Sequence, residues 1–579
     1  MLSVLFALAV LQSSVGSAPG GAGPGRSVGD WTALPTPRFS EIRSVEAAPA
    51  PLLGGSHVLH PTDGPSPRTA APPPRLPLPA LTKLLEEEAA RGSRLEIFRS
   101  SASLLVRGDP AAVDVARARI AELDRIADTF AIDLEVDLAG STPAGGAKAG
   151  SGAAPVSGPE HWTAARRVAS GEDVFVGSRL STAFVMTFDV EVAADSGIAS
   201  PVLGSACTGR TLHLRAARVE AGRRIRIEGL LDLADLRSIE RFDPETADLG
   251  IVQEPVVDFV QVAFAGVVEP GKALEVKITG APLALADWTL AIRATAKPDD
   301  AAPPAKPDSV TAKPDNAAGK DAALDVLDLG GLAAAPIALP AASPGAVLDR
   351  QAPFVPATPA VRAGLPVPPS AIAAELDGRG SDGSGSVGRP SIAWSDDLLV
   401  LRRSDAAIRA EARALVAAAE APRLATRTLA VRRGGFSATF PACAGAPARL
   451  LVGRERTAVA GYRVQIAPQT WMAAPEVVKV FDGFSLDAEL VGGAADCALW
   501  VAESAPPFVA PRKDAQIGKL EILSRTLRSD RGRVAAGDPE RVLAPRPGSG
   551  AGGGNDSAQG PNSGSNSGPD SIVVRCLAP

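Results

Sequence analysis

The side chains best suited to move protons or bind metals are few in this sequence and widely spaced. They are four histidines and four cysteines: His57, His60, His161, His213, Cys207, Cys443, Cys497 and Cys576. A zinc site needs such ligands at short spacings, and acid–base catalysis needs a histidine or carboxylate beside its reacting group. Only His57 and His60 have a ligand-like spacing, within a Pro/Gly-rich tract, and no Cys-x-x-Cys pair occurs. We therefore predict no catalytic residue, no metal-binding or cofactor-binding residue, and no cofactor.

The motifs of the common enzyme classes are also absent from the sequence. It has no Gly-x-Ser-x-Gly elbow, no His-Glu-x-x-His pair and no Gly-x-x-x-x-Gly-Lys-Ser/Thr phosphate loop. Residues 383–388 match Gly-x-Gly-x-x-Gly only inside a Gly/Ser-rich tract, where no strand precedes and no helix follows. The acidic run Glu86-Glu87-Glu88 is typical of the solvated face of a short helix over 81–91. We predict that the protein is not an enzyme.

The remaining polar and aromatic candidates have structural interpretations. His213 falls on a predicted strand, where a solvent-facing or hydrogen-bonded side chain is expected rather than a catalytic base. The four cysteines allow one or two disulfides in an oxidising compartment, with three possible connectivities, or four buried apolar side chains. Core anchors are favoured over a sugar-binding platform for five of the tryptophans, Trp162, Trp288, Trp394, Trp471 and Trp500.

Composition narrows the possible partners. The net charge of the 579 residues is −6 with a pI near 5.6, and both signs are interspersed. No basic stripe is available to neutralise phosphates, so we predict no nucleic-acid binding. The 57 glycines and 52 prolines are concentrated in blocks that indicate linkers, at 19–79, 141–159, 297–389 and 547–570.

The N-terminus has the pattern of an export signal. Residues 2–11 are almost entirely apolar and are followed by small residues up to Ala18, which predicts a signal peptide over 1–18. The alternative is a buried N-terminal helix. The apolar run is too short to span a bilayer, and we predict no transmembrane helix in the mature protein.

Two segments repeat the same order of elements. In the first, the apolar residues 102–108 lead through Asp109-Pro110 into a helical pattern over 111–123. In the second, residues 396–401 lead through Ser404-Asp405 into a helical pattern over 406–419. Asp109 and Ser404 suit N-cap positions, and Pro110 suits the first helical turn. A strand follows each helix, at 130–136 and 428–431, so each segment predicts a small α+β unit.

Alternating segments continue the parallel beyond each unit. Val174–Arg179 corresponds to Leu450–Glu455, and Phe188–Ala193 to Tyr462–Ala467. Each pair is followed by a Pro-containing segment, at 200–202 and 474–477, and then by a Gly-containing one, at 208–212 and 482–486. Alternation with turn residues about every ten positions predicts antiparallel sheet with one wet face.

This order resembles the secretins, the outer-membrane ring proteins of bacterial secretion and pilus systems. Their ring-building domains have a strand, a cap and a helix ending in Leu-Asp, as at Leu104–Pro110 and Leu123-Asp124; the second copy has Ala419-Glu420 instead. Phe188–Leu214, Tyr462–Ala488 and Phe259–Val276 look like parts of the secretin β-domain. The chain lacks the Pro-Leu-Leu-Gly-Asp-Ile-Pro-like stretch of that domain, and we expect none of the long amphipathic hairpins that face lipid in pore-forming members.

We predict an α+β, mainly β fold with two tandem copies of a ring-building-like α+β domain, each followed by a secretin-like β-domain. The predicted boundaries are 1–18 signal peptide, 19–79 disordered arm, 80–140 first α+β domain, 160–296 first β-domain, 297–389 flexible linker, 390–432 second α+β domain, and 433–579 second β-domain with a disordered insert at 547–570. The resemblance implies a structural or assembly role in envelope secretion, in the periplasm or outer membrane, with secretion proteins or further copies of the chain as partners. The alternative is an exported protein whose β-domains bind a protein or polysaccharide.

Overall fold

A computed structural model describes much of the 579-residue chain. The described residues are 27–28, 31–35, 58–59, 82, 85, 95–99, 103–141, 161–244, 249–280, 287–296, 324–329, 391–394, 398–402, 406–446, 448–466, 468, 470–491, 496–504, 508–514, 518–524, 527–535, 541–543 and 572–577. The predicted signal peptide, His57, His60, Ser404 and the insert at 547–570 lie outside them.

Strands predominate, which confirms the predicted mainly β, α+β class. The helices of the described part are α3 (Pro110–Thr129), α6 (Ala406–Glu420) and the short 3₁₀-helix η4 (Ala421–Arg423). The strands are β1 (Ser27–Val28), β2 (Trp31–Pro35), β3 (Val58–Leu59), β4 (Leu95–Arg99), β5 (Ser103–Gly108), β6 (Ala131–Ser141), β7 (His161–Ala169), β8 (Glu172–Val192), β9 (Gly197–Val219), β10 (Arg224–Phe242), β11 (Val252–Val268), β12 (Ala273–Thr279), β13 (Asp287–Ala296), β14 (Leu324–Asp328), β15 (Ser391–Trp394), β16 (Leu398–Arg402), β17 (Thr426–Arg433), β18 (Phe436–Cys443), β19 (Ala448–Ile466), β20 (Trp471–Val491), β21 (Asp496–Ser504), β22 (Phe508–Asp514), β23 (Gly518–Ser524), β24 (Leu527–Ala535), β25 (Arg541–Leu543) and β26 (Ile572–Leu577).

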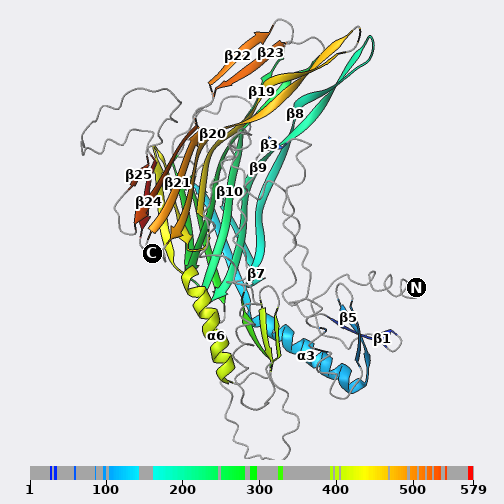
Figure 1. The fold of residues 1–579 in the computed structure, drawn as a ribbon, viewed down its shortest axis with the longest axis vertical. Coiled ribbons are helices and arrows are strands. Elements are labelled where there is room, and N and C mark those ends of the chain that lie inside the picture. Colours follow the sequence, from blue (N-terminus) through cyan, green and yellow to red (C-terminus); the bar gives the residue numbers. More distant parts are fainter. Residues whose placement is uncertain are drawn as a thin grey trace, which may run out of the picture.

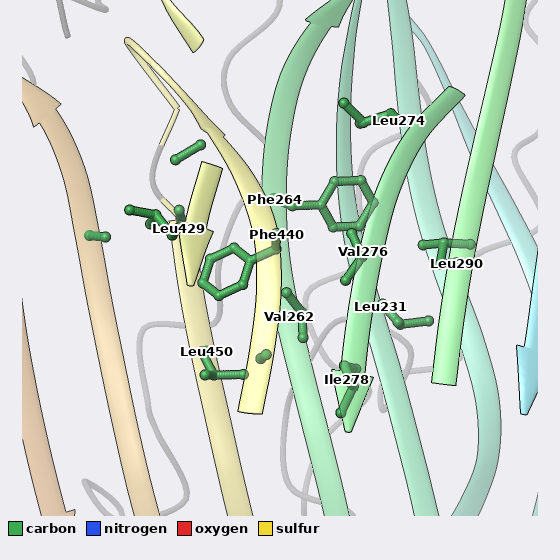
Figure 2. Packing of buried hydrophobic residues seen from close by; sticks show 14 of the residues in the cluster. Leu231, Val262, Phe264, Leu274, Val276, Ile278, Leu290, Leu429, Phe440 and Leu450 are labelled. Carbon is green, nitrogen blue, oxygen red and sulfur yellow. The ribbon is translucent and has the colours of Figure 1, made fainter. Parts of the chain in front are cut away.

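Two sheets pack face to face. The large sheet has the order β24-β21-β20-β19-β11-β10-β9-β3, with β8 also paired to β9, and the facing sheet has the order β25-β26-β17-β18-β12-β13-β6-β7. Buried side chains from both sheets form one apolar cluster. Figure 2 shows part of it, with Leu231, Val262 and Phe264 of the large sheet near Val276 and Leu290 of the facing sheet. Burial of this apolar area is the main force that holds the sandwich together.

Both halves of the chain contribute to each sheet. In the large sheet, β11 pairs with β19 from Val256↔Arg456 to Ala263↔Arg449; in the facing sheet, β12 pairs with β18. The sequence predicts two consecutive β-domains, at 160–296 and 433–579, whereas their strands share one sandwich. The shared sandwich also determines the burial of β11, where residues 254–266 are buried without interruption. Such a run is typical of a strand that is covered on both faces.

Two hairpins are much longer than the sequence predicts. β8 and β9 pair from Glu172↔Ala216 to Val192↔Gly197, and β19 and β20 pair from Ala448↔Ala488 to Ile466↔Trp471. The expectation is therefore wrong about the length of the hairpins, while the absence of lipid-facing hairpins stays a prediction. The Pro-containing segments at 200–202 and 474–477 lie within β9 and β20, where Pro201 pairs with Phe188 and Pro475 with Tyr462. Proline fits there because β10 pairs with β9 only from Gly209 onward and β21 with β20 only from Gly483 onward, so a strand neighbours each proline on one side only.

Glycine at 483 is required by the backbone of β20. Its φ is +157°, and a Cβ there would lie 2.1 Å from the Val452 carbonyl oxygen. We expect Gly483→Ala to lower the free energy of unfolding by about 1–3 kcal/mol, because the strand must distort. Gly461→Ala in β19 is the matched control, since a Cβ there would meet only the Glu476 side chain, at 3.3 Å or beyond. Urea unfolding of both variants measures the difference; equal midpoints would contradict the prediction.

The first helix begins as the sequence predicts. The Asp109 carboxylate accepts a hydrogen bond from the Ala111 N–H at 3.1 Å, and Pro110 is the first residue of α3. One face of the helix packs on β2 and β5 through a buried cluster that includes Leu34, Leu104 and Ile120. The helix extends to Thr129, six residues past the predicted end at Leu123.

Two segments predicted to be linkers contain strands. Within the predicted arm, β2 pairs with β5 and β3 pairs with β9; Leu34 and Val58 are buried there. Within the predicted linker 297–389, β14 pairs with β16. Val326 of β14 and Val400 of β16 join the same apolar cluster as α3. In both tracts, a strand pairs with a strand from elsewhere in the chain. Single apolar residues of these strands are buried against that part of the protein.

Candidate functional site

His213 is buried in a charged cluster on the large sheet. Its Nε2 lies 3.1 Å from Asp173 Oδ1, and its ring stacks on Phe175 with centroids 4.2 Å apart. Arg215 donates to both Asp173 oxygens, at 2.8 and 3.0 Å. Burial alone would raise the pKa of Asp173, but the hydrogen bond from His213 and the charge of Arg215 outweigh burial and lower the pKa. Within the described residues, His213 Nδ1 is buried and has no hydrogen-bond partner.

The other sequence candidates are dispersed. His161 Nε2 lies 2.8 Å from Asp137 Oδ1 at an exposed position. Trp288 is buried as a core anchor, as predicted, whereas Trp471 is 49% exposed, and for it the prediction is wrong. In the described part of the chain, no group of three His, Cys, Asp or Glu side chains is placed to hold a metal ion. None of the helices described here is both long enough and apolar enough to cross a membrane.

A second buried charged cluster joins α6 to the sandwich. We call it the junction cluster; its members are Arg226, Glu228, Glu420, Arg423 and Cys443. The Glu420 carboxylate accepts a hydrogen bond from the Glu220 N–H at 2.8 Å, and Arg226 lies 2.6 Å from Glu228. The Cys443 thiol donates to the Arg423 carbonyl at 2.8 Å, and burial raises the pKa of this thiol.

The junction cluster also changes the ionisation of a carboxyl group. Burial raises the pKa of Glu420 to about 7, with a further contribution from the negative charge of Asp328 and opposition from the Glu220 N–H. The bond from the Glu220 N–H to the Glu420 carboxylate attaches the second helix to the turn between β9 and β10, which indicates a structural role. Sequence reasoning did not identify Glu420, because its burial depends on a turn 200 residues away in the chain.

The most distinctive surface is formed by the outer ends of the two long hairpins. We call residues 184–206 and 459–477 the projecting hairpins; they extend past the other strands of the sandwich (Figure 1). They pack on each other through a separate apolar cluster that contains Phe188, Val459 and Met472. Thr187 Oγ1 also donates to the Pro475 carbonyl at 2.5 Å. The two hairpins therefore support each other away from the main core.

The projecting hairpins also carry apolar side chains that are exposed on the surface. Ile466 and Trp471 are paired at the end of one hairpin and are 78% and 49% exposed. Ile198 and Leu203, on the other, are also mostly exposed. Single exposed apolar residues are ordinary on a protein surface, but several at the ends of two supported hairpins are typical of a contact surface.

A groove of about 450 Å³ lies between the two hairpins and is lined in part by residues of the cluster through which they pack. Its lining combines apolar residues such as Phe188 and Val202 with the charged residues Asp189, Arg463 and Glu476. Arg463 and Asp189 face each other across it at 4.0 Å. Its polar lining consists of the Thr187 hydroxyl together with these charged side chains, so the groove can bind a polar ligand.

Comparisons with known proteins give matches only among solved structures. No family model and no curated protein matches the chain. The secretin domain of InvG from the Salmonella SPI-1 injectisome is 14% identical over 41% of this chain and 82% of that one, with a TM-score of 0.19. The Vibrio cholerae competence pilus secretin PilQ is 9% identical over 51% and 82%, with a TM-score of 0.20. The type II secretin GspD from Escherichia coli K12 is 11% identical over 51% and 67%, with a TM-score of 0.17. At these identities and TM-scores, function has to be inferred from the residues of this chain.

Proposed function

We propose that the protein is a non-enzymatic structural component of a bacterial envelope secretion system and that its copies assemble edge to edge through the large sheet. The observation that carries this proposal is the pair of open edges of that sheet. Among the described strands, β8 pairs only with β9, and β24 pairs only with β21. A strand edge presents N–H and C=O groups to any chain that can extend the sheet; on β8 one of these groups, the Val185 N–H, already donates to Gln253 Oε1.

The two open edges lie at opposite ends of the sheet (Figure 1). Pairing β8 of one copy with β24 of the next is therefore a head-to-tail contact, which produces a ring when the rotation between copies closes. The projecting hairpins would lie on the same end of every copy in such a ring. Their exposed apolar residues would then form a continuous band, which supports an envelope partner for the assembled form.

A proline in β8 tests the edge contact. The Val185 N–H points away from β9, because it donates to Gln253 Oε1 at 2.7 Å. N–H groups of alternate residues point to the same side of a strand, so the N–H of the exposed Ala183 also points away from β9. We expect Ala183→Pro to remove a donor from the open edge, leave the β8–β9 ladder intact and weaken self-association at least tenfold.

Ala183→Ser keeps the N–H and is the matched control. Light scattering coupled to size exclusion, with electron microscopy of the purified full chain, measures the assembly, and circular dichroism verifies that both variants fold. We expect large assemblies for the wild type and for Ala183→Ser, and small species for Ala183→Pro. A wild-type chain that stays monomeric at high concentration, with or without lipid vesicles, would rule out the proposal.

The groove between the projecting hairpins favours a second candidate, an exported protein that binds a protein or polysaccharide. Its charged rim of Asp189, Arg463 and Glu476 suits polar ligands. A monomeric chain that binds glycans on an array, with binding lost in Arg463→Ala and retained in the exposed control Arg167→Ala, would favour this candidate over assembly.

A further inference from the structure

Two of the four cysteines meet between the sheets. Cys497 belongs to β21 of the large sheet, where it pairs with Leu490 and Val534, and Cys576 belongs to β26 of the facing sheet, where it pairs with Leu429. Both side chains are buried in the main apolar cluster, and each thiol shifts the pKa of the other through a hydrogen bond between them. Two interacting thiols on facing sheets of a sandwich are candidates for an inter-sheet disulfide.

The other two cysteines have different surroundings. The Cys443 thiol donates to the Arg423 carbonyl, and the Cys207 sulfur lies 3.9 Å from the Ser205 hydroxyl. Of the six pairs that four cysteines allow, the structure thus favours one, Cys497 with Cys576. We propose that these two residues form a redox-active pair that closes a disulfide between β21 and β26 under oxidising conditions.

The electrostatics assign the two thiols different parts in the reaction. The hydrogen bond from Cys497 and the positive charge of Arg427 lower the pKa of Cys576 to about 7, against the effect of burial. The same hydrogen bond, together with burial, raises the pKa of Cys497. Because the thiolate is the nucleophile in exchange reactions, Cys576 reacts first.

The reaction proceeds as two exchanges with a small-molecule disulfide. The Cys576 thiolate attacks one sulfur of the oxidant, whose S–S bond breaks and releases one thiolate, and a mixed disulfide forms on Cys576. Cys497 then loses its proton and attacks the Cys576 sulfur, which releases the second thiolate. The protein loses two hydrogens in total, and the oxidant is reduced to two thiols.

Access of the oxidant depends on local opening of β26. This strand has six residues, pairs with β25 only over residues 572–574, and ends at the exposed Leu577. A short strand near the end of a sheet opens more readily than the core strands do. Oxidation should therefore be faster in urea concentrations below the unfolding transition. The bond formed would close the chain between residues 497 and 576.

The test uses the reduced full chain and oxidised glutathione as the probe. After alkylation under denaturing conditions and digestion, mass spectrometry should show one cross-linked pair of peptides that contain Cys497 and Cys576, with Cys207 and Cys443 alkylated. The oxidised protein should have a Tm about 5 °C or more above the reduced protein. The double variant Cys207→Ala, Cys443→Ala should give the same cross-link and the same shift.

Single variants separate the two steps. Cys497→Ala should stop at a glutathione adduct on Cys576, and Cys576→Ala should leave Cys497 without an adduct under the same conditions. Cys497 and Cys576 both remaining alkylatable after oxidation in mild urea, or linked to Cys207 or Cys443, would overturn the proposal. The same oxidation can be carried out on Ala183→Pro, which leaves both cysteines in place. Disulfide formation is therefore tested separately from assembly.

Discussion

Replacing Phe264 with alanine should lower the free energy of unfolding by about 3–5 kcal/mol, the range found when a buried aromatic ring is removed. Phe264 is 2% exposed and lies in the centre of the sandwich (Figure 2). Its ring covers Gly229 on the paired strand β10, since a Cβ at Gly229 would lie 2.2 Å from Phe264 Cζ. Removing the ring leaves a cavity that Gly229 has no side chain to fill.

Phe98→Ala is the control for this loss, because Phe98 in β4 is 47% exposed. The same chemical change there should cost less than about 1 kcal/mol. Urea unfolding followed by circular dichroism measures both variants, and the slope m should stay constant if only the native state changes. A loss for Phe264→Ala no larger than that for Phe98→Ala would mean that the sheets do not pack as described.

Glu420→Gln should remove a pH dependence of stability. The pKa of Glu420 rises from 4.5 to about 7 on folding, mainly because of burial. The folded state therefore binds this proton more tightly than the unfolded state does. The stabilisation is complete below pH 4.5 and is lost as the pH rises to about 7, and the total loss is on the order of 3 kcal/mol.

Glutamine resembles the protonated carboxyl group and still accepts the hydrogen bond from the Glu220 N–H. We expect Glu420→Gln to be more stable than the wild type at pH 8 and close to it at pH 4.5. Glu191→Gln, an exposed carboxylate of β8, should retain the pH dependence of the wild type. Unfolding midpoints measured between pH 4 and 8 decide the question; parallel curves for the wild type and Glu420→Gln would contradict the assignment.

Local features of the fold could be predicted from the sequence because local chemistry determines them. Asp109 and Pro110 define the start of α3 whatever surrounds the helix. The alternation in residues 132–138 likewise identified β6, whose even-numbered residues are buried. The mainly β class followed from many such segments. The matching order of elements in the two halves is consistent with an internal repeat, which stays a prediction.

The long-range features could not be predicted, because they depend on which strands become neighbours. Pro201 and Gly209 both lie within β9. Pro201 has a paired strand on one side only, whereas Gly209 pairs with both β8 and β10. The burial of Glu420 and the contact between Cys497 and Cys576 likewise arise from elements that are distant in the chain. The exposed Trp471 had no local signal, because its position at a hairpin end depends on the length of β19 and β20.

The sharing of both sheets by the two halves affects the order in which the protein can be made. During synthesis, β11 is complete at Val268, but its partner β19 ends only at Ile466. At ~5–20 residues per second, the ribosome needs roughly 10–40 s to supply those ~200 residues. Throughout that interval the nascent chain carries the bare, apolar flank of β11. Chaperone capture or delayed folding is therefore expected in the cell, and a gene fragment that ends before β19 should yield insoluble protein.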